Sequence, residues 1–164
     1  MVRSRIRYFF HYYATMIIYL GADHRGFALK ETIKQYLQQS GYQMVDLSAA
    51  VLTPDDDYPD YAVAVAKKVG ADFLGSRGLL FCGSGVGMDI VANRFPLVRC
   101  ALTFSPDQAM ASRTDDDTNM IALPADFLDP EIAKKIVSIW LQTEFDGKEG
   151  HKRRLEKIRN LQIE

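Results

Sequence analysis

Short apolar runs alternate with longer amphipathic stretches along the chain from Met16 onward. Runs of four to six mostly apolar residues are typical of buried strands. The sequence therefore predicts five strands, at residues 17–20, 42–47, 78–81, 98–103 and 120–123.

The stretches between these runs repeat apolar residues at helical spacing. Residues 27–39 carry one such face, formed by Leu29, Ile33, Tyr36 and Leu37. Gly41 closes this helix, and Asp129 caps a later one that has Pro130 at its first position. Helices are predicted at residues 27–39, 58–69, through 90–91 to about 93, at 106–113, after residue 129, and from about residue 151.

Strands that alternate with helices at this spacing imply right-handed crossovers and a parallel sheet. The predicted fold is α/β: a three-layer, Rossmann-like arrangement with a five-stranded parallel sheet and a C-terminal helix. The 164 residues fall within the size range of one domain that can bury a sizeable core.

Composition narrows the partners that are expected. A net charge of −1 gives no general reason to expect nucleic acid or an acidic membrane surface. A membrane span needs about 20 apolar residues in a row, and no such run is present. The two cysteines, Cys82 and Cys100, are far apart and in apolar context, which favours a reduced, soluble, cytoplasmic protein.

The first fifteen residues differ from the rest of the chain. Arg3, Arg5 and Arg7 precede a run of aromatic residues, which superficially resembles a targeting signal. The run is short and rich in tyrosine, and it leads directly into Met16, which opens the first strand. Residues 1–15 are therefore expected to be either an artefact of start-site choice or an added arm, with the domain at residues 16–164.

Ligands of open parallel sheets bind outside the carboxyl ends of the strands. Three segments are expected there: residues 23–26, 82–87 and 113–119. The second segment, Cys82-Gly83-Ser84-Gly85-Val86-Gly87, is the most informative. Its alternate glycines allow a ligand to approach the backbone, and its amides favour an anion and are expected to lower the pKa of the thiol.

Other glycine-rich motifs do not fit this segment. Met88 stands where a dinucleotide-binding fingerprint has its third glycine and where a thiol phosphatase has its arginine, and no lysine follows as in a Walker loop. The interpretation that remains is a reactive thiol facing a turn whose amides stabilise an anion. The plainer alternative is a buried cysteine beside a tight turn.

Four motifs together resemble the family of type B ribose-5-phosphate isomerases and bacterial galactose-6-phosphate isomerases. They are Gly21-Ala22-Asp23-His24-Arg25-Gly26-Phe27; Asp57-Tyr58-Pro59-Asp60-Tyr61-Ala62; residues 82–87 with Ala92-Asn93; and Ser112-Arg113 with Asp117-Thr118-Asn119. The resemblance runs from Met16 to about Leu161.

The resemblance implies an aldose–ketose isomerase that moves a proton through a cis-enediolate without metal or other cofactor. Cys82 corresponds to the base and Ser84 to an assisting hydroxyl, and the amides of Gly83, Gly85, Val86 and Gly87 would hold the oxyanion. Asp23 corresponds to a sugar-hydroxyl ligand, and His24 and Arg154 correspond to phosphate contacts. The family also implies a homodimer with its active site at the subunit interface.

The chain departs from the family pattern near the substrate. Asp115 and Asp116 stand where the family has a ring-opening histidine and an asparagine. An exposed aspartate is ionised at neutral pH and is a poor proton donor. Asp126 and Gly150 stand where the family has phosphate-binding arginines, which leaves Arg154, with Lys148, Lys152 or Arg153 as substitutes.

Three hypotheses follow. The chain is a sugar-phosphate isomerase in which Asp115 takes the catalytic position and Asp116 a substrate-binding one; or it isomerises a different, unphosphorylated or positively charged sugar; or it is a non-catalytic sugar-binding or scaffold protein. The plainer interpretation of residues 115–117 is a solvated helix end, because the sequence identifies no histidine or distant carboxylate to complete a metal site with them.

Overall fold

The computed structural model describes residues 16–161, so the hypotheses about residues 1–15 lie outside the described part of the chain. The strands are β1 (Ile17–Ala22), β2 (Gln43–Asp46), β3 (Ser76–Cys82), β4 (Cys100–Leu102) and β5 (Met120–Pro124). The helices are α2 (Phe27–Gln39), α3 (Tyr58–Ala71), α4 (Val86–Ala92), α5 (Pro106–Asp116), α6 (Pro130–Gln142) and α7 (Glu149–Arg159).

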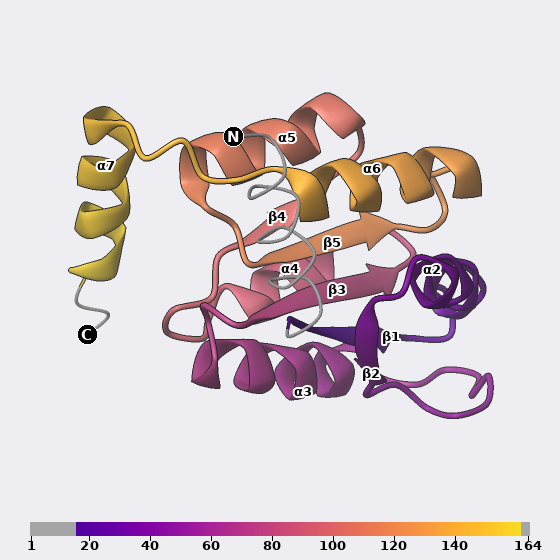
Figure 1. Ribbon diagram of the computed structural model, residues 1–164. Coiled ribbons are helices and arrows are strands. Elements are labelled where there is room, and N and C mark those ends of the chain that lie inside the picture. Colours follow the sequence, from indigo (N-terminus) through magenta and orange to yellow (C-terminus); the bar gives the residue numbers. More distant parts are fainter. Residues whose placement is uncertain (1–15, 162–164) are drawn as a thin grey trace.

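The five strands form one parallel sheet in the order β2-β1-β3-β5-β4. Helices α2, α5 and α6 contribute buried residues to one face of the sheet, and α3 and α4 to the other. Figure 1 shows α5 and α6 above the sheet and α3 below it. The predicted three-layer α/β fold is confirmed.

The central strand β3 is buried along its whole length, which explains why it extends beyond the predicted residues 78–81. It pairs with β1 on one side and β5 on the other, so its backbone groups are satisfied from Ser76 to Cys82. The predicted strand at residues 98–103 is shorter in the structure, since β4 lies at the sheet edge and pairs only with β5.

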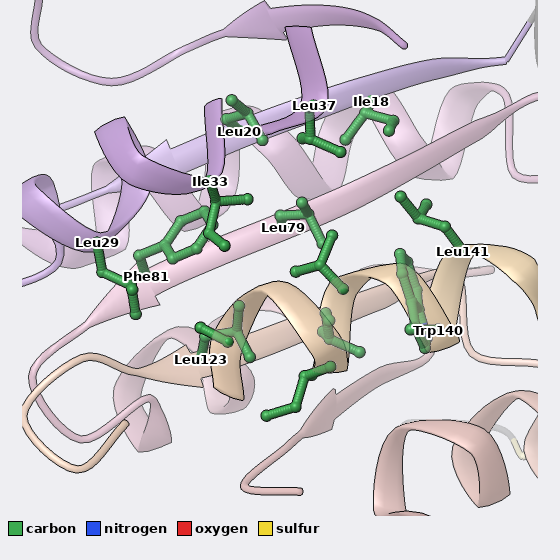
Figure 2. Packing of buried hydrophobic residues seen from close by; sticks show 14 of the residues in the cluster. Ile18, Leu20, Leu29, Ile33, Leu37, Leu79, Phe81, Leu123, Trp140 and Leu141 are labelled. Atoms are coloured by element: carbon green, nitrogen blue, oxygen red, sulfur yellow. The ribbon is translucent and has the colours of Figure 1, made fainter. Parts of the chain in front are cut away.

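Alternate residues of the strands fill the larger core. Leu79 and Phe81 of β3 and Leu123 of β5 point toward α2 and α6, where they meet Ile33 and Trp140 (Figure 2). The indole of Trp140 donates a hydrogen bond of 2.9 Å to the Thr118 hydroxyl, so this large side chain is buried without an unsatisfied donor. The core therefore holds β3 and β5, and with them the segments that follow these strands, in a rigid frame.

Helix α7 differs from the other helices. The structure describes all of its residues and none of them is buried. Figure 1 shows it standing beside the sheet, on the side from which the β3 and β5 arrows start. A cavity of about 500 Å³ lies between α7 and residues 93–99, lined in part by Phe95, Leu97, Leu155 and Ile158. An apolar stripe of α7 is thus only loosely covered by its own chain. Among residues 16–161, no helix has the length and apolar character that crossing a membrane requires.

Candidate active site

Cys82 is the last residue of β3 and is 5% exposed. Its Sγ accepts a hydrogen bond of 3.1 Å from the amide of Gly85. Gly85 has a left-handed backbone (φ 75°), and a methyl group there would lie 2.4 Å from Leu102 Cδ1. The turn that brings an amide onto the thiol therefore requires glycine at this position.

Burial raises the pKa of the Cys82 thiol, and the Gly85 amide opposes this effect only in part. The predicted lowering of this pKa is wrong. Removing the thiolate from water outweighs the amide hydrogen bonds, and the nearby charge of Asp23 adds to the increase. Ionisation of this thiol is therefore less favourable than ionisation of a cysteine in water.

Asp23 lies beside Cys82 because its loop is tied to β3. Its amide donates to the carbonyl of Phe81 over 3.2 Å, and its Oδ1 accepts a hydrogen bond of 2.9 Å from the amide of Gly26. The side chain is buried, and burial raises its pKa. The structure thus brings Asp23 and the thiol together, as predicted from their positions after adjacent strands.

His24 is oriented by Asp56, a residue to which the sequence assigned no role. Asp56 Oδ1 accepts two hydrogen bonds of 2.8 Å from His24, one from its amide and one from Nδ1. The hydrogen bond to Asp56 raises the pKa of the imidazole. Burial opposes ionisation of Asp56, but the bonds from His24 outweigh it and lower that pKa. Because Nδ1 is bonded to Asp56, Nε2 is the ring nitrogen left for a ligand, and the raised pKa favours the cationic form of the ring, which suits an anionic group.

Two side chains lie directly against the glycines of the turn. A methyl group at Gly87 would lie 2.5 Å from the ring of Tyr58, and one at Gly83 would lie 2.3 Å from Cζ of Arg25. Arg25 in turn forms an ion pair with Asp126, whose amide donates to the Gly83 carbonyl over 3.0 Å. Tyr58 and Arg25 were part of the sequence motifs, but only the structure shows that they cover the turn.

The segment at residues 113–119 does not lie at this edge of the sheet, and that prediction is wrong. Helix α5 starts after the carboxyl end of β4 and carries the chain back to the other edge, where the amides of Asn119 and Met120 donate to the carbonyl of Arg99. The five residues of β5 span about 13 Å between the two edges. Within one chain, Asp115 and Asp116 therefore cannot share a small substrate with Cys82.

A second polar cluster forms at this amino edge. His151 Nδ1 lies 2.9 Å from Oδ1 of Asp146 and 3.8 Å from Oδ1 of Asp115. Asp146 also accepts from the amide of Lys148, which lowers its pKa together with the Lys148 and His151 side chains. Arg154 is exposed on α7, away from Asp23 and His24. We call Asp115, Asp116, Asp146, His151 and Arg154 the amino-edge cluster.

Three members of this cluster have donor atoms that suit a divalent cation. Asp115, Asp146 and His151 each offer one within 4.8 Å of the others. The fold thus supplies the histidine and the distant carboxylate that the sequence did not identify. However, the ammonium of Lys148 lies 2.9 Å from Asp146 and already balances its charge.

The three aspartates at residues 115–117 differ in their contacts and exposure. Asp117 accepts from Arg113 over 2.6 Å and from Arg99 over 2.8 Å, so it ends α5 as a structural residue. Asp115 and Asp116 are exposed. The interpretation as a uniformly solvated helix end is therefore wrong for Asp117.

The sequence and the fold of this chain are similar to those of known sugar-phosphate isomerases. The family model described as Ribose/Galactose Isomerase matches residues 18–158. Ribose-5-phosphate isomerase B of Mycobacterium tuberculosis is 36% identical over 141 residues, covering 86% of each chain. D-erythrulose-4-phosphate isomerase of Pectobacterium atrosepticum is 39% identical over 141 residues, covering 86% of this chain and 91% of that one. The crystal structure of ribose-5-phosphate isomerase B from Mycoplasma genitalium with bound ribulose 5-phosphate superposes with a TM-score of 0.86 at 35% identity, covering 88% of this chain and 95% of that one.

Proposed function

The chain belongs to the ribose/galactose isomerase family, and we propose that it interconverts ribose 5-phosphate, or a closely related aldose phosphate, and its ketose by proton transfer at Cys82. As an aldose–ketose isomerase of sugar phosphates it shares the reaction class of its relatives. The observation that carries the proposal for Cys82 is the buried thiol, held by the Gly85 amide beside Asp23.

The proton transfer uses groups of the Cys82 turn. The thiolate removes the proton from C2 of the open-chain aldose, and the electron pair of that bond forms the enediolate with its charge on O1. The thiol then returns the proton to C1, and the hydroxyl of Ser84, which is exposed at the turn, moves a proton between O2 and O1. The substrate ends as the ketose and the thiolate is regenerated.

The amides of the turn divide into two groups. The Gly85 amide is bonded to Cys82 Sγ, so it stabilises the thiolate. The Val86 amide is 3.4 Å from the Ser84 hydroxyl and orients it. The amides of Gly83 and Gly87 are then the donors for the oxyanion, and Asp23 and His24 take a sugar hydroxyl and the phosphate.

A second copy of the chain completes this site in our proposal. Within one chain, the amino-edge cluster and Cys82 lie at opposite edges of a sheet whose strand β5 is about 13 Å long, so the cluster acts on the substrate of a partner in a homodimer. The exposure of Asp115 and Asp116 and the loose packing of α7 support this arrangement. Helix α7 would then carry Arg154 to the partner's phosphate.

Ring opening needs a proton donor that Asp115 alone does not supply. His151 lies 3.8 Å from Asp115 and is held by Asp146. An imidazole that is hydrogen-bonded to one carboxylate and lies close to a second can take part in proton transfer. We therefore propose that Asp115 and His151 act together in place of the family's histidine.

The deciding experiment is isomerisation of ribose 5-phosphate by the purified protein, its Cys82→Ala variant and a panel of sugars with and without phosphate. Turnover that depends on Cys82 supports the proposal. Activity confined to an unphosphorylated or positively charged sugar would mean that Asp115, Asp116 and Asp126 mark a changed specificity. Sugar binding without turnover of any of them would mean a binding or scaffold role.

A further inference from the structure

Arg25 holds a position over the Cys82 turn that glycine alone permits. A methyl group at Gly83 would lie 2.3 Å from Cζ, 2.4 Å from Nε and 2.8 Å from Nη1 of Arg25. The guanidinium therefore lies directly against the backbone of the residue that follows the proposed base. Its side chain is still 56% exposed, so donor groups of the guanidinium remain open to a ligand in front of the turn.

Asp126 keeps the guanidinium in this place. Its carboxylate pairs with Nη2 of Arg25, and its own amide donates to the carbonyl of Gly83 over 3.0 Å. The loop after β5 is thus bonded to the turn and to the side chain above the turn. An arginine that is already ordered loses less conformational entropy on binding an anion than a free one does.

The ion pair of Arg25 and Asp126 lies where the resemblance implies a positive charge. The resemblance implies a phosphate-binding arginine at position 126, whereas this chain has an aspartate, which carries the opposite charge. The guanidinium has not been lost from the region, because Arg25 brings one from the neighbouring loop and Asp126 serves as its anchor.

We infer that Arg25 binds the anionic group of the substrate beside the Cys82 turn, and that Asp126 is a positioning residue for it. This inference rests on the proposed function and specifies its substrate class: a sugar that carries a phosphate or another anionic group. The five donors of a guanidinium allow it to bond a phosphate while one nitrogen stays with Asp126.

The test measures KM and kcat for ribose 5-phosphate and for unphosphorylated ribose. Arg25→Ala removes charged hydrogen bonds and is expected to raise KM for ribose 5-phosphate about 10- to 100-fold, with kcat little changed and ribose unaffected. Arg94→Ala is the matched control, since this exposed arginine lines the cavity beside α7 at the other edge. An equal loss in both arginine variants, or an equal loss for both sugars, overturns the inference.

Variants of Asp126 distinguish its positioning of Arg25 from the effect of its negative charge on phosphate binding. Asp126→Ala removes a negative charge, so a purely electrostatic effect would lower KM for the phosphate. Loss of positioning is expected to raise it about 3- to 10-fold instead. The reversed pair, Arg25→Asp with Asp126→Arg, is expected to bind better than Arg25→Asp alone. A lower KM in Asp126→Ala, or no rescue in the reversed pair, contradicts the role of Asp126.

Binding measurements keep this inference distinct from the proposed function. Calorimetry of ribose 5-phosphate and of inorganic phosphate with the Cys82→Ala protein reports the anion site without turnover. Phosphate binding that weakens in Arg25→Ala supports the site even in a protein that isomerises no sugar. Binding that is the same with and without Arg25 overturns the site even in an active isomerase.

Discussion

The two edges of the sheet, to which we assign the two halves of the proposed chemistry, are built in different ways. At the carboxyl edge, Cys82 and Asp23 are buried and each accepts a hydrogen bond from a backbone amide. At the amino edge, Asp115, Asp116 and Arg154 are exposed, and the helix that carries Arg154 has no buried residue along its fully described length.

This difference indicates which part of the proposed active site a single chain can form on its own. A base needs a fixed position and a controlled environment, and the strand ends and tight turn around Cys82 provide both. Three members of the amino-edge cluster, Asp115, Asp116 and Arg154, are left open to solvent, as expected for groups that receive their final environment from another molecule. The predictions below test whether the carboxyl edge does the proton transfer and whether the amino edge serves a neighbouring subunit.

The largest expected effect is at the carboxyl edge. Cys82→Ala removes the general base and is expected to lower kcat about 1000-fold, measured by conversion of ribose 5-phosphate and by exchange of the C2 proton with deuterated solvent. Cys100→Ala is the control, because this second cysteine lies in β4 and outside the turn. Similar losses in both variants would contradict the assignment of the base.

Removing the proton donor at the amino edge should have a smaller effect that depends on the substrate. His151→Gln and Asp115→Asn are each expected to lower kcat for ribose 5-phosphate about 10- to 100-fold, because the furanose ring must open first. An aldotetrose 4-phosphate cannot form such a ring, so its turnover should change much less. Equal losses on both substrates would place these residues outside ring opening.

Mixing two impaired variants tests whether the edges meet across a subunit interface. In a random mixture of Cys82→Ala and Asp115→Asn chains, half of the dimers are mixed and each has one intact site. About a quarter of the wild-type activity should therefore return on mixing. A mixture as inactive as its components would show that each chain acts alone, and sedimentation of the wild-type protein would then give its oligomeric state.

Alanine substitutions at two glycines with left-handed backbones test how tightly each edge is packed. Gly85→Ala introduces a methyl group 2.4 Å from Leu102, whereas Gly147→Ala, near the amino edge, meets its nearest atom at 3.8 Å. In both variants, the left-handed backbone strains the alanine and is expected to lower the free energy of unfolding by about 1 kcal/mol. In Gly85→Ala, the overlap of the methyl group with Leu102 is expected to lower it by about 1–3 kcal/mol more. Urea unfolding of both variants measures the difference, and equal losses of unfolding free energy would contradict close packing of the turn.

The smallest expected effect is a shift in pH dependence. With the Cys82 thiolate as the proposed base, kcat should increase with pH on an alkaline limb, because burial raises the pKa of this thiol above its ordinary 9.0. Asp23→Asn removes a negative charge that contributes to this increase, so the limb should move to lower pH by less than about one unit. A limb that stays in place would mean that the field of Asp23 does not reach the thiol.

Much of the fold could be predicted because it depends on local patterns. Helix α2 matches its predicted range, and Asp129 caps α6 by accepting hydrogen bonds from the amides of Glu131 and Ile132, as its position after a loop and before proline indicated. The ends of β3 and β4 could not be predicted, because they depend on how many neighbours each strand pairs with.

The sequence by itself determined the parallel α/β architecture, the family, and the placement of Cys82, Asp23 and His24 after adjacent strands. The architecture and the placement follow from residue spacing along the chain, and the family follows from the resemblance of the four motifs. The tertiary structure alone decided that Asp115 lies beside His151 and across the sheet from Cys82, that Arg25 and Asp126 meet over Gly83, and that burial raises the thiol pKa. The reason is physical: pKa values, ion pairs and the edge to which a helix returns depend on groups distant in sequence, and only the folded chain brings those groups together.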